Sequence, residues 1–514
     1  MPSTRAAFDR ATLAFAIVLV AVTWLRIAIL RVNGFELYFD EAQYWAWSRS
    51  FDWGYFSKPP LVAWVIAATT ALFGDAEWAV RLGAPIGQAI AASALFALGR
   101  SMYGAWPGFW AGLGWLMLPG VFVSSGVIST DAVMLPFWAL GMFALWRLTN
   151  TRAWAWAILL GVFVGVGTLA KYAMLYFFIC AALAAWWVLP VREGLAKGRG
   201  IVAALTAAAI MAPNLVWNFQ NGFATARHTA SNARLDPGDL FNVDELIEFI
   251  GGQAGVIGPL LFLVLVWALW RAMGRTRSRE DDFLLAFMLP ALAFVTALSF
   301  LSRANANWVA VSYPAIVVWV TGLLFGSRGG RRLLVAATTV NLLLASAFAG
   351  VIALRPDLAT QVKGVRETRG WAHAAREIAQ RASAQPGDAP FTAVMVDDRA
   401  LFFELNYYWR DAREGGAALP PLRMWRLHAE AGNSAEAVDP MRVEEGGRVL
   451  IVHMRGDYLP LIAADFTVFR RADHLSIPLG GDYARELDIS VGEGFAPVAR
   501  DEAFEERLRG RNER

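Results

Sequence analysis

Long apolar runs limit what this chain can fold into more than any other feature of its sequence. Each is about 17–23 residues long, which is the length that a helix needs to cross the hydrocarbon core of a bilayer. We therefore expect a polytopic α-helical membrane protein with about eleven transmembrane helices, and a hydrophobic fraction of 57% against 17% charged residues agrees with that class. The runs lie at 11–30, 81–99, 105–123, 131–147, 153–170, 172–190, 200–217, 252–270, 282–301, 308–325 and 332–354.

The distribution of basic residues predicts which loops face which side. One further run, 60–73, is short and better suited to an interfacial helix in the first outer loop. If that run stays interfacial and the N-terminus is cytoplasmic, alternate loops carry the excess of Lys and Arg, as the positive-inside rule requires. These loops contain Arg100, Arg147, Arg152, Arg192, Lys197, Arg199, Arg271, Arg275, Arg277, Arg279, Arg328, Arg331 and Arg332.

The apolar runs stop after Arg355. Residues 366–382 have the pattern of an amphipathic helix, and short apolar runs at 391–396, 448–454 and 487–491 are typical of strands. We therefore predict two domains, a transmembrane domain at 1–354 and a soluble α/β domain at 355–514 on the outer side, with a frayed tail from 500. Asp397, Asp398 and Arg399 are expected to form a strand-to-helix turn of little catalytic weight.

Three polar segments gather on the predicted outer side. The first combines Asp40 and Glu41 with Lys58, the second ends in Asp131, and the third contains Arg303. Charges so close to hydrocarbon are costly, so they usually have a partner or a task. Lys171 lies at the outer end of its predicted span, so its charge is also close to the hydrocarbon.

Each candidate also has a structural interpretation. Asp40 and Glu41 suit the positive N-terminal end of an amphipathic helix at 41–49. Asp131 lies where the next span needs an N-cap. Lys171 could extend to the headgroups, and Arg303 could be an interfacial anchor.

The same residues suit transfer of a sugar from a polyprenyl phosphate. A carboxylate would orient or deprotonate the acceptor hydroxyl, and cations would stabilise the departing lipid phosphate. Other chemistries have less support: the five histidines lack metal-ligand spacing, and the single Cys180 excludes an internal disulfide. Basic residues do not cluster with aromatics, so nucleic acid is not an expected partner.

Five short motifs occur in order over residues 1–350, and together they resemble a known family. The chain is similar to the GT-C superfamily of membrane glycosyltransferases, in the bacterial branch related to protein O-mannosyltransferases and the lipid A aminoarabinose transferase. The motifs are Phe39-Asp40-Glu41-x-x-Tyr44-Trp45, Ser57-Lys58-Pro59-Pro60-Leu61, Ser129-Thr130-Asp131, Leu169-Ala170-Lys171-Tyr172 and Asn305-Ala306-Asn307-Trp308.

The resemblance implies an inverting glycosyltransferase that uses an undecaprenyl- or related polyprenyl-phosphate sugar on the periplasmic face of the bacterial inner membrane. It implies a glycolipid acceptor, with lipid A or the lipopolysaccharide core favoured. We expect a monomer with no obligatory metal or other cofactor, and a divalent ion at Asp40 and Asp131 stays an alternative that the residue spacing does not support. The implied roles are catalytic for Asp40, Glu41 and Asp131, donor-phosphate binding for Lys58, Lys171 and Arg303, and substrate binding for Tyr44, Asn305, Asn307 and Trp308.

Three other functions stay open at this point. A protein O-glycosyltransferase would have the same fold and a different acceptor. A transporter or flippase for lipid-linked sugars should carry ionisable residues near the bilayer midplane and internal repeats, neither of which is evident. A non-catalytic envelope scaffold would leave the charged set without a task.

Overall fold

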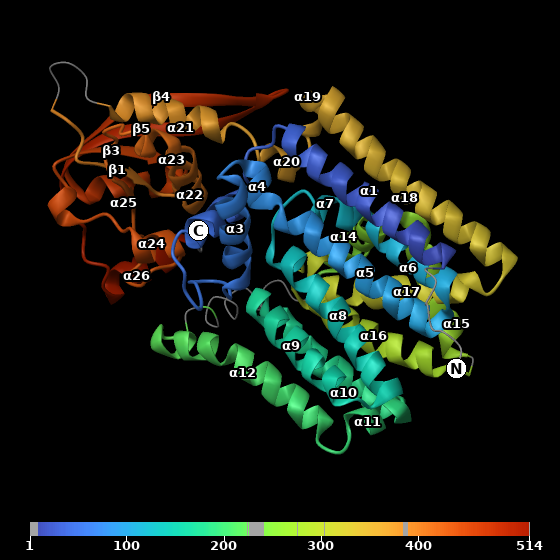
Figure 1. Ribbon diagram of the computed structural model, residues 1–514. Coiled ribbons are helices and arrows are strands. Elements are labelled where there is room, and N and C mark those ends of the chain that lie inside the picture. The colour runs from blue at the N-terminus through green and yellow to red at the C-terminus, as the bar shows by residue number, and fades with distance from the viewer. Residues whose placement is uncertain are drawn as a thin grey trace. The chain divides into compact units, whose positions relative to one another are not determined.

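The computed structural model describes residues 9–223, 225, 241–274, 276–302, 304–383 and 389–512. The chain divides into two compact units, which are described separately (Figure 1). The first comprises Met1–Asn33, Asp52–Gly54 and Lys58–Gly350, and the second comprises Gly34–Phe51, Tyr55–Ser57 and Val351–Arg514. Most of the segment that carries Asp40 therefore folds with the C-terminal part of the chain.

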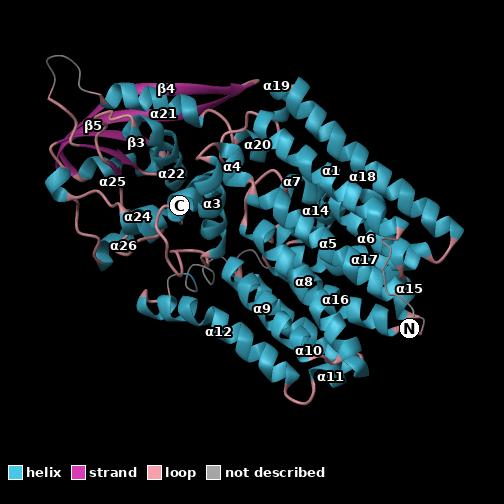
Figure 2. Ribbon diagram, in the orientation of Figure 1, coloured by secondary structure: helices cyan, strands magenta, loops and turns pink. Residues whose placement is uncertain are grey.

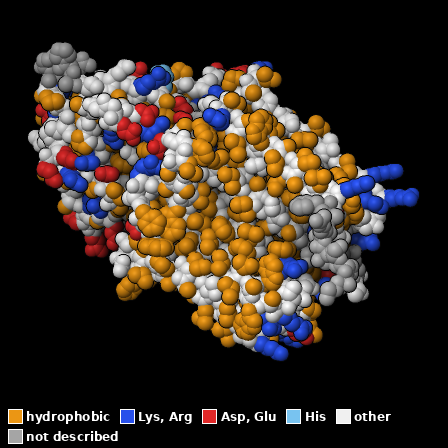
Figure 3. Space-filling model, viewed as in Figure 1, with side chains coloured by type: hydrophobic (Ala, Val, Ile, Leu, Met, Phe, Trp, Pro, Cys, Tyr) orange, Lys and Arg blue, Asp and Glu red, His pale blue; other side chains and the backbone are white. Residues whose placement is uncertain are grey.

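The first unit is helical, and each predicted apolar run lies on helical segments. Figure 3 shows hydrophobic side chains over a broad face of these helices. The helices are α1 (Arg10–Val32), α3 (Leu61–Phe73), α4 (Glu77–Arg81), α5 (Gly83–Tyr103), α6 (Ala105–Leu116), α7 (Pro119–Ser124), α8 (Thr130–Thr151), α9 (Trp154–Ala170), η1 (Tyr172–Leu175), α10 (Tyr176–Trp187), α11 (Leu189–Leu195), α12 (Arg199–Gln220), α14 (Val243–Ile257), α15 (Pro259–Met273), α16 (Arg279–Leu301), η3 (Ala306–Ser312), α17 (Tyr313–Phe325) and α18 (Arg328–Leu354).

The helices confirm a multi-pass membrane class, while the predicted number of spans stays unconfirmed. Within the described residues, seven helical segments are long and apolar enough to cross a membrane, or eight if the bent pair α14–α15 forms one span. Three shorter apolar segments, at α3, α9 and η1–α10, have 10–17 residues. The predicted helix at 60–73 is present as α3, and its position relative to the bilayer stays a prediction.

The run at 252–270, which we predicted as one transmembrane span, is divided by a sharp bend. Its two halves, α14 and α15, meet at 113°. Gly258 has a φ of +91°, which only glycine adopts easily, and Pro259 lacks the amide hydrogen that would continue the ladder. Asn341 donates from Nδ2 to the freed Ile257 carbonyl at 3.0 Å. Hydropathy alone cannot detect this bend because both halves are apolar.

Close helix packing in this unit depends on small residues. A Cβ added at Gly161 of α9 would lie 2.4 Å from the Ala203 carbonyl oxygen of α12, and one at Gly165 would lie 2.9 Å from Cβ of Ile210. Glycine therefore allows the backbones of α9 and α12 to approach, which is the packing typical of membrane helices.

The second unit is a mixed α/β fold around one sheet (Figure 2). The sheet order is β2-β1-β3-β5-β4, with β1 parallel to both β2 and β3 and β5 antiparallel to β3 and β4. Its elements are α2 (Phe39–Ser48), α19 (Pro356–Ala359), α20 (Lys363–Arg366), α21 (Trp371–Ala382), β1 (Ala393–Val396), α22 (Arg399–Tyr408), α23 (Arg410–Glu414), β2 (Leu422–Met424), α24 (Ser434–Val438), η4 (Val443–Glu445), β3 (Arg448–His453), η5 (Gly456–Tyr458), α25 (Leu459–Ala464), β4 (Phe466–Gly480), β5 (Tyr483–Phe495) and α26 (Glu502–Asn512).

The predicted strands at 391–396, 448–454 and 487–491 are confirmed as β1, β3 and part of β5. The prediction of a frayed tail from residue 500 was wrong. Residues 502–512 form α26, and Phe504 is only 4% exposed, so burial of one aromatic side chain helps to hold a segment whose composition is mostly charged.

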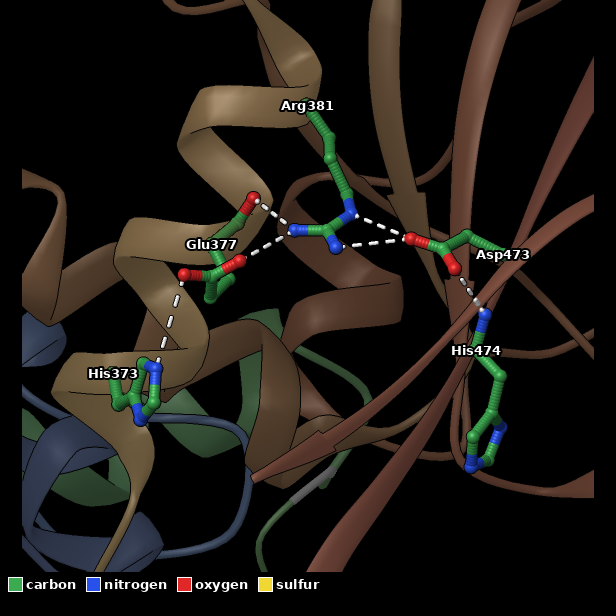
Figure 4. A network of polar contacts seen from close by, with 5 residues as sticks. All are labelled: His373, Glu377, Arg381, Asp473 and His474. Carbon is green, nitrogen blue, oxygen red and sulfur yellow. Dashed lines mark hydrogen bonds and ion pairs between the residues drawn. The ribbon is translucent and has the colours of Figure 1, made fainter. Parts of the chain in front are cut away.

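Ion pairs join helix α21 to strand β4 (Figure 4). Arg381 donates from Nε and Nη2 to the Asp473 carboxylate at 3.0 and 2.9 Å, and from Nη1 to Glu377 at 2.7 Å. Because Arg381 belongs to α21 and Asp473 to β4, this network fixes the helix against the sheet. Such solvent-screened pairs set orientation more than stability.

Candidate active site

Three of the predicted site residues meet in the helical unit, from three distant segments. Lys171 donates from Nζ to both carboxylate oxygens of Asp131, each at 2.8 Å. Asn307 donates from Nδ2 to Oδ2 of the same carboxylate at 3.1 Å. The Asp131 side chain is 14% exposed and that of Lys171 is 25% exposed, so the pair is largely shielded but still open on one side.

Local structure explains why these side chains converge. Ser129 caps α8 by accepting from the Ala132 amide at 3.1 Å, which places Asp131 in the first helical turn. Lys171 ends α9 in an extended conformation, with φ −158° and ψ 133°. Asn307 lies in the 3-10 turn η3. All three residues therefore lie at ends of helices. The prediction that the Asp131 region caps the next span is confirmed, because Ser129 is the N-cap of α8, and Asp131 in addition pairs with Lys171.

Polar contacts beside Lys171 support the break between α9 and α10. Tyr172 donates from its hydroxyl to Asn214 Oδ1 at 2.9 Å and accepts from Asn218 Nδ2 at 2.9 Å. Asn214 also donates to the Trp53 carbonyl at 2.6 Å. These buried amides hold α12 and the segment of Trp53 next to Lys171.

Asp40 lies in the second unit, on α2, and its described partner comes from the C-terminal fold. Arg399 donates from Nη2 to Oδ1 of Asp40 at 3.2 Å, and its guanidinium lies 4.9 Å from the centroid of the Phe39 ring. Asp40 is 38% exposed and Arg399 is 28% exposed. A pair this exposed contributes only about 0–1 kcal/mol to stability, so its clearest consequence is the orientation of Asp40.

The adjacent carboxylate has a structural role. Glu41 is buried and accepts from the Tyr38 amide at 2.9 Å, which closes a capping box at the start of α2. The predicted helix at 41–49 is thereby confirmed as α2, and a catalytic role for Glu41 stays a prediction. The pKa of the Tyr38 phenol is raised by burial and by the nearby carboxylates of Glu367 and Asp40.

Arg399 is the residue that sequence reasoning undervalued. The predicted strand-to-helix turn is confirmed: β1 ends at Val396, and Asp398 caps α22 by accepting from the Ala400 amide at 2.7 Å. That turn directs Arg399 to Asp40, 359 positions earlier in the chain. No local pattern links two residues so far apart.

The remaining predicted residues occupy different settings. Tyr44 is buried against Trp47, with ring centroids 5.5 Å apart. Lys58 is half-buried just before α3, Asn305 is exposed, and Trp308 is partly buried in η3. Arg303 lies outside the described residues. No group of three or more metal-ligating His, Cys, Asp or Glu side chains occurs in the described part of the chain.

Similarity to known proteins extends over most of the chain. The model of the family described as dolichyl-phosphate-mannose-protein mannosyltransferase matches residues 57–217. The chain is also 33% identical over 402 residues to the lipid A galacturonosyltransferase RgtD of Rhizobium johnstonii, which covers 77% of this chain and 82% of that protein. The chain therefore belongs to the GT-C superfamily of membrane glycosyltransferases.

Among solved structures, the fold is similar to ArnT from Cupriavidus metallidurans. The crystal structure bound to undecaprenyl phosphate superposes with a TM-score of 0.60 at 16% identity, covering 93% of this chain and 98% of ArnT. The apo structure gives 0.57 at 17% identity, covering 94% and 98%. At this identity the likeness concerns the fold, and membership of a glycosyltransferase superfamily disfavours the transporter and scaffold hypotheses.

Proposed function

We propose that this protein transfers a sugar from a polyprenyl-phosphate carrier to a lipid A or lipopolysaccharide-core acceptor on the periplasmic face of the inner membrane. The observation that carries this proposal is the cluster of Asp131, Lys171 and Asn307, which presents a partly open cation at the ends of apolar helices. Similarity to a lipid A galacturonosyltransferase supports the acceptor class, and it makes a uronosyl group the first candidate for the sugar. The fold shared with an undecaprenyl-phosphate-bound ArnT supports the carrier.

The proposed chemistry is a direct displacement at the anomeric carbon. An acceptor oxygen forms the new bond to that carbon while the bond to the carrier phosphate breaks, and the phosphate leaves with the electron pair. Asp40 takes the proton of an acceptor hydroxyl, and attack opposite the leaving group inverts the anomeric configuration. Lys171, with Lys58 and Arg303, stabilises the charge on the departing phosphate.

The remaining assignments belong to the same proposal. Asp131 orients Lys171, while Tyr44, Asn305, Asn307 and Trp308 contact substrate. These cations would carry the phosphate charge without a metal, so transfer should persist in the presence of a chelator. The enzyme acts as a monomer.

Mass spectrometry of envelope glycolipids from cells that lack this protein would test the proposed function. We expect the loss of one sugar-sized mass from lipid A or core, restored by the wild-type gene. An unchanged glycolipid profile together with the loss of a sugar from envelope proteins would instead establish the second candidate, a protein O-glycosyltransferase. The description of the matching family model favours that alternative.

Replacement of Arg399 should separate its orienting role from a stabilising one. We expect Arg399→Gln to lower kcat/KM for transfer by about 10- to 100-fold, because a charge-assisted hydrogen bond to Asp40 is lost. Arg399→Lys should retain more activity, since it keeps the positive charge. Thermal unfolding of both variants should stay close to wild type.

A matched substitution, Arg470→Gln, removes an exposed arginine of β4 that pairs with Glu493. Its activity should be unchanged. Equal activity of Arg399→Gln and Arg470→Gln would refute an orienting role for Arg399.

A further inference from the structure

The α/β unit contains a cavity whose lining residues, apart from Arg399, have no part in the proposed roles. Its volume is about 220 Å³, below the roughly 300 Å³ at which sites for drug-sized ligands begin. The cavity therefore suits one small polar group, such as a single sugar ring. Residues that line it include Asp397, Arg399, Trp425, Asn433, Arg455 and Tyr458.

The cavity lies where parallel sheets commonly bind ligands. Asp397 follows β1, Trp425 follows β2 and Arg455 comes shortly after β3, so the lining comes from the carboxyl ends of three parallel strands. The chain leaves β1 toward β2 and leaves β3 toward β4, on opposite sides of the β1–β3 pair. Such a divergence creates a crevice at the strand ends.

The floor of this crevice is fixed by Asp397. Its carboxylate accepts from the amides of Met454 and Arg455 at 3.0 and 3.2 Å, which ties the loop after β3 to the end of β1. Burial raises the pKa of Asp397 to about 6. A carboxyl held in this way can accept from a sugar hydroxyl as well as from the backbone.

The walls combine two arginines with the ring of Tyr458, and they also contain His428 and Glu436, whose carboxylate accepts from the Gly432 amide at 2.8 Å and from Asn433 Nδ2 at 2.7 Å. Arg455 donates from Nε and Nη2 to Asp398 at 3.1 and 2.9 Å, while Arg399 donates from Nη2 to Asp40. A guanidinium has five donor hydrogens, so each arginine has more donors than these bonds use and can also contact a ligand oxygen. Trp425 is 2% exposed and belongs to the hydrophobic core, whereas the ring of Tyr458, whose centroid lies 6.0 Å from that of Trp425, is half-buried and supplies an apolar surface on which a sugar face can stack.

We propose that this cavity binds one anionic sugar unit, either a uronate or a sugar phosphate. The arginines bind its charged group, the carboxyl of Asp397 accepts from its hydroxyls, and the Tyr458 ring packs against its apolar face. The inference rests on the proposed glycosyl transfer, and it adds a consequence: because Arg399 lines the cavity and also bonds Asp40, occupancy and the orientation of Asp40 are linked through one guanidinium.

Ligand-observed NMR titrations of the purified full-length protein in detergent would test the site. The probes are glucuronate and glucose 1-phosphate, with glucose and inorganic phosphate as comparisons. We expect saturable binding of the two anionic sugars, weakened about tenfold or more by Arg455→Gln because a charged hydrogen bond is lost. Tyr458→Leu, which keeps an apolar side chain, should weaken both sugars through loss of stacking, and Arg470→Gln should leave both unchanged.

Three results would overturn the proposal: no binding of either anionic sugar, equal binding in wild type and Arg455→Gln, or inorganic phosphate binding as tightly as glucose 1-phosphate. Binding is also measured in Asp40→Asn. It should persist there whether or not the wild-type protein transfers a sugar, so failure of this site and failure of the proposed function are distinguishable.

Steady-state kinetics of Arg455→Gln would identify the source of the sugar. A raised KM for the acceptor assigns the site to the acceptor's saccharide, and a raised KM for the donor assigns it to the transferred sugar. Either result supports the site, whereas unchanged values of both KM and kcat contradict it.

Discussion

Asp40→Asn is expected to reduce kcat for glycosyl transfer by about 10²- to 10⁴-fold, the range that general base catalysis supplies. Asparagine has the same shape and can still accept from Arg399, so α2 should keep its structure. The protein should therefore reach wild-type abundance in the membrane while the transferred sugar disappears from the glycolipid profile. Product formation by purified enzyme and mass spectrometry of complemented cells would measure these effects.

A suitable control is Asp411→Asn, which changes a 77% exposed aspartate of the same unit. It should transfer sugar at the wild-type rate. Full activity of Asp40→Asn at normal abundance would remove Asp40 from the mechanism.

The size of this effect also reports on the acceptor. A hydroxyl acceptor must lose a proton, so it needs the base throughout. A phosphate acceptor is already an anion, and Asp40 would then only position groups. A loss smaller than about tenfold would therefore indicate phosphate as the acceptor group.

Lys171→Met is expected to lower transfer by at least about 10²-fold, comparable to the loss of one preorganised donor to a developing charge. It should also destabilise the helical unit by up to about 3 kcal/mol, because the shielded Asp131 side chain would lose its cation partner. Enzyme assays with a polyprenyl-phosphate sugar and thermal unfolding in detergent would measure the two effects separately.

The double variant Asp131→Asn with Lys171→Met separates phosphate binding from a structural ion pair. Removing both charges should restore abundance and thermal stability, because no unpaired charge remains. If Lys171 binds phosphate, activity stays lost. Recovery of activity in the double variant would show that the pair only stabilises the fold. Lys363→Met, at a lysine whose side chain is 78% exposed, should behave as wild type.

Predictions from sequence succeeded where neighbouring residues decide the outcome. Ser129 before an apolar run predicts a helix start because its hydroxyl can cap the next amides, and α8 begins there. The strands β1 and β3 follow from short apolar runs between polar turns. The bend at Gly258 was not predicted because both halves of that run are apolar, although Gly258-Pro259 is a local breaker signal. The helix α26 was not predicted because it depends on burial of Phe504 by distant residues.

Hydropathy and motif order by themselves determined the membrane class, the α/β character of the C-terminal region and the residues worth testing. Each of these depends on local composition or on spacing within a few turns. Only the tertiary structure decided which candidates are partners: Asp131 meets Lys171 across 40 positions and Asn307 across 176, and Asp40 meets Arg399 across 359. The physical reason is that a side chain's partner is set by how whole elements pack, and sequence separation carries no information about that packing.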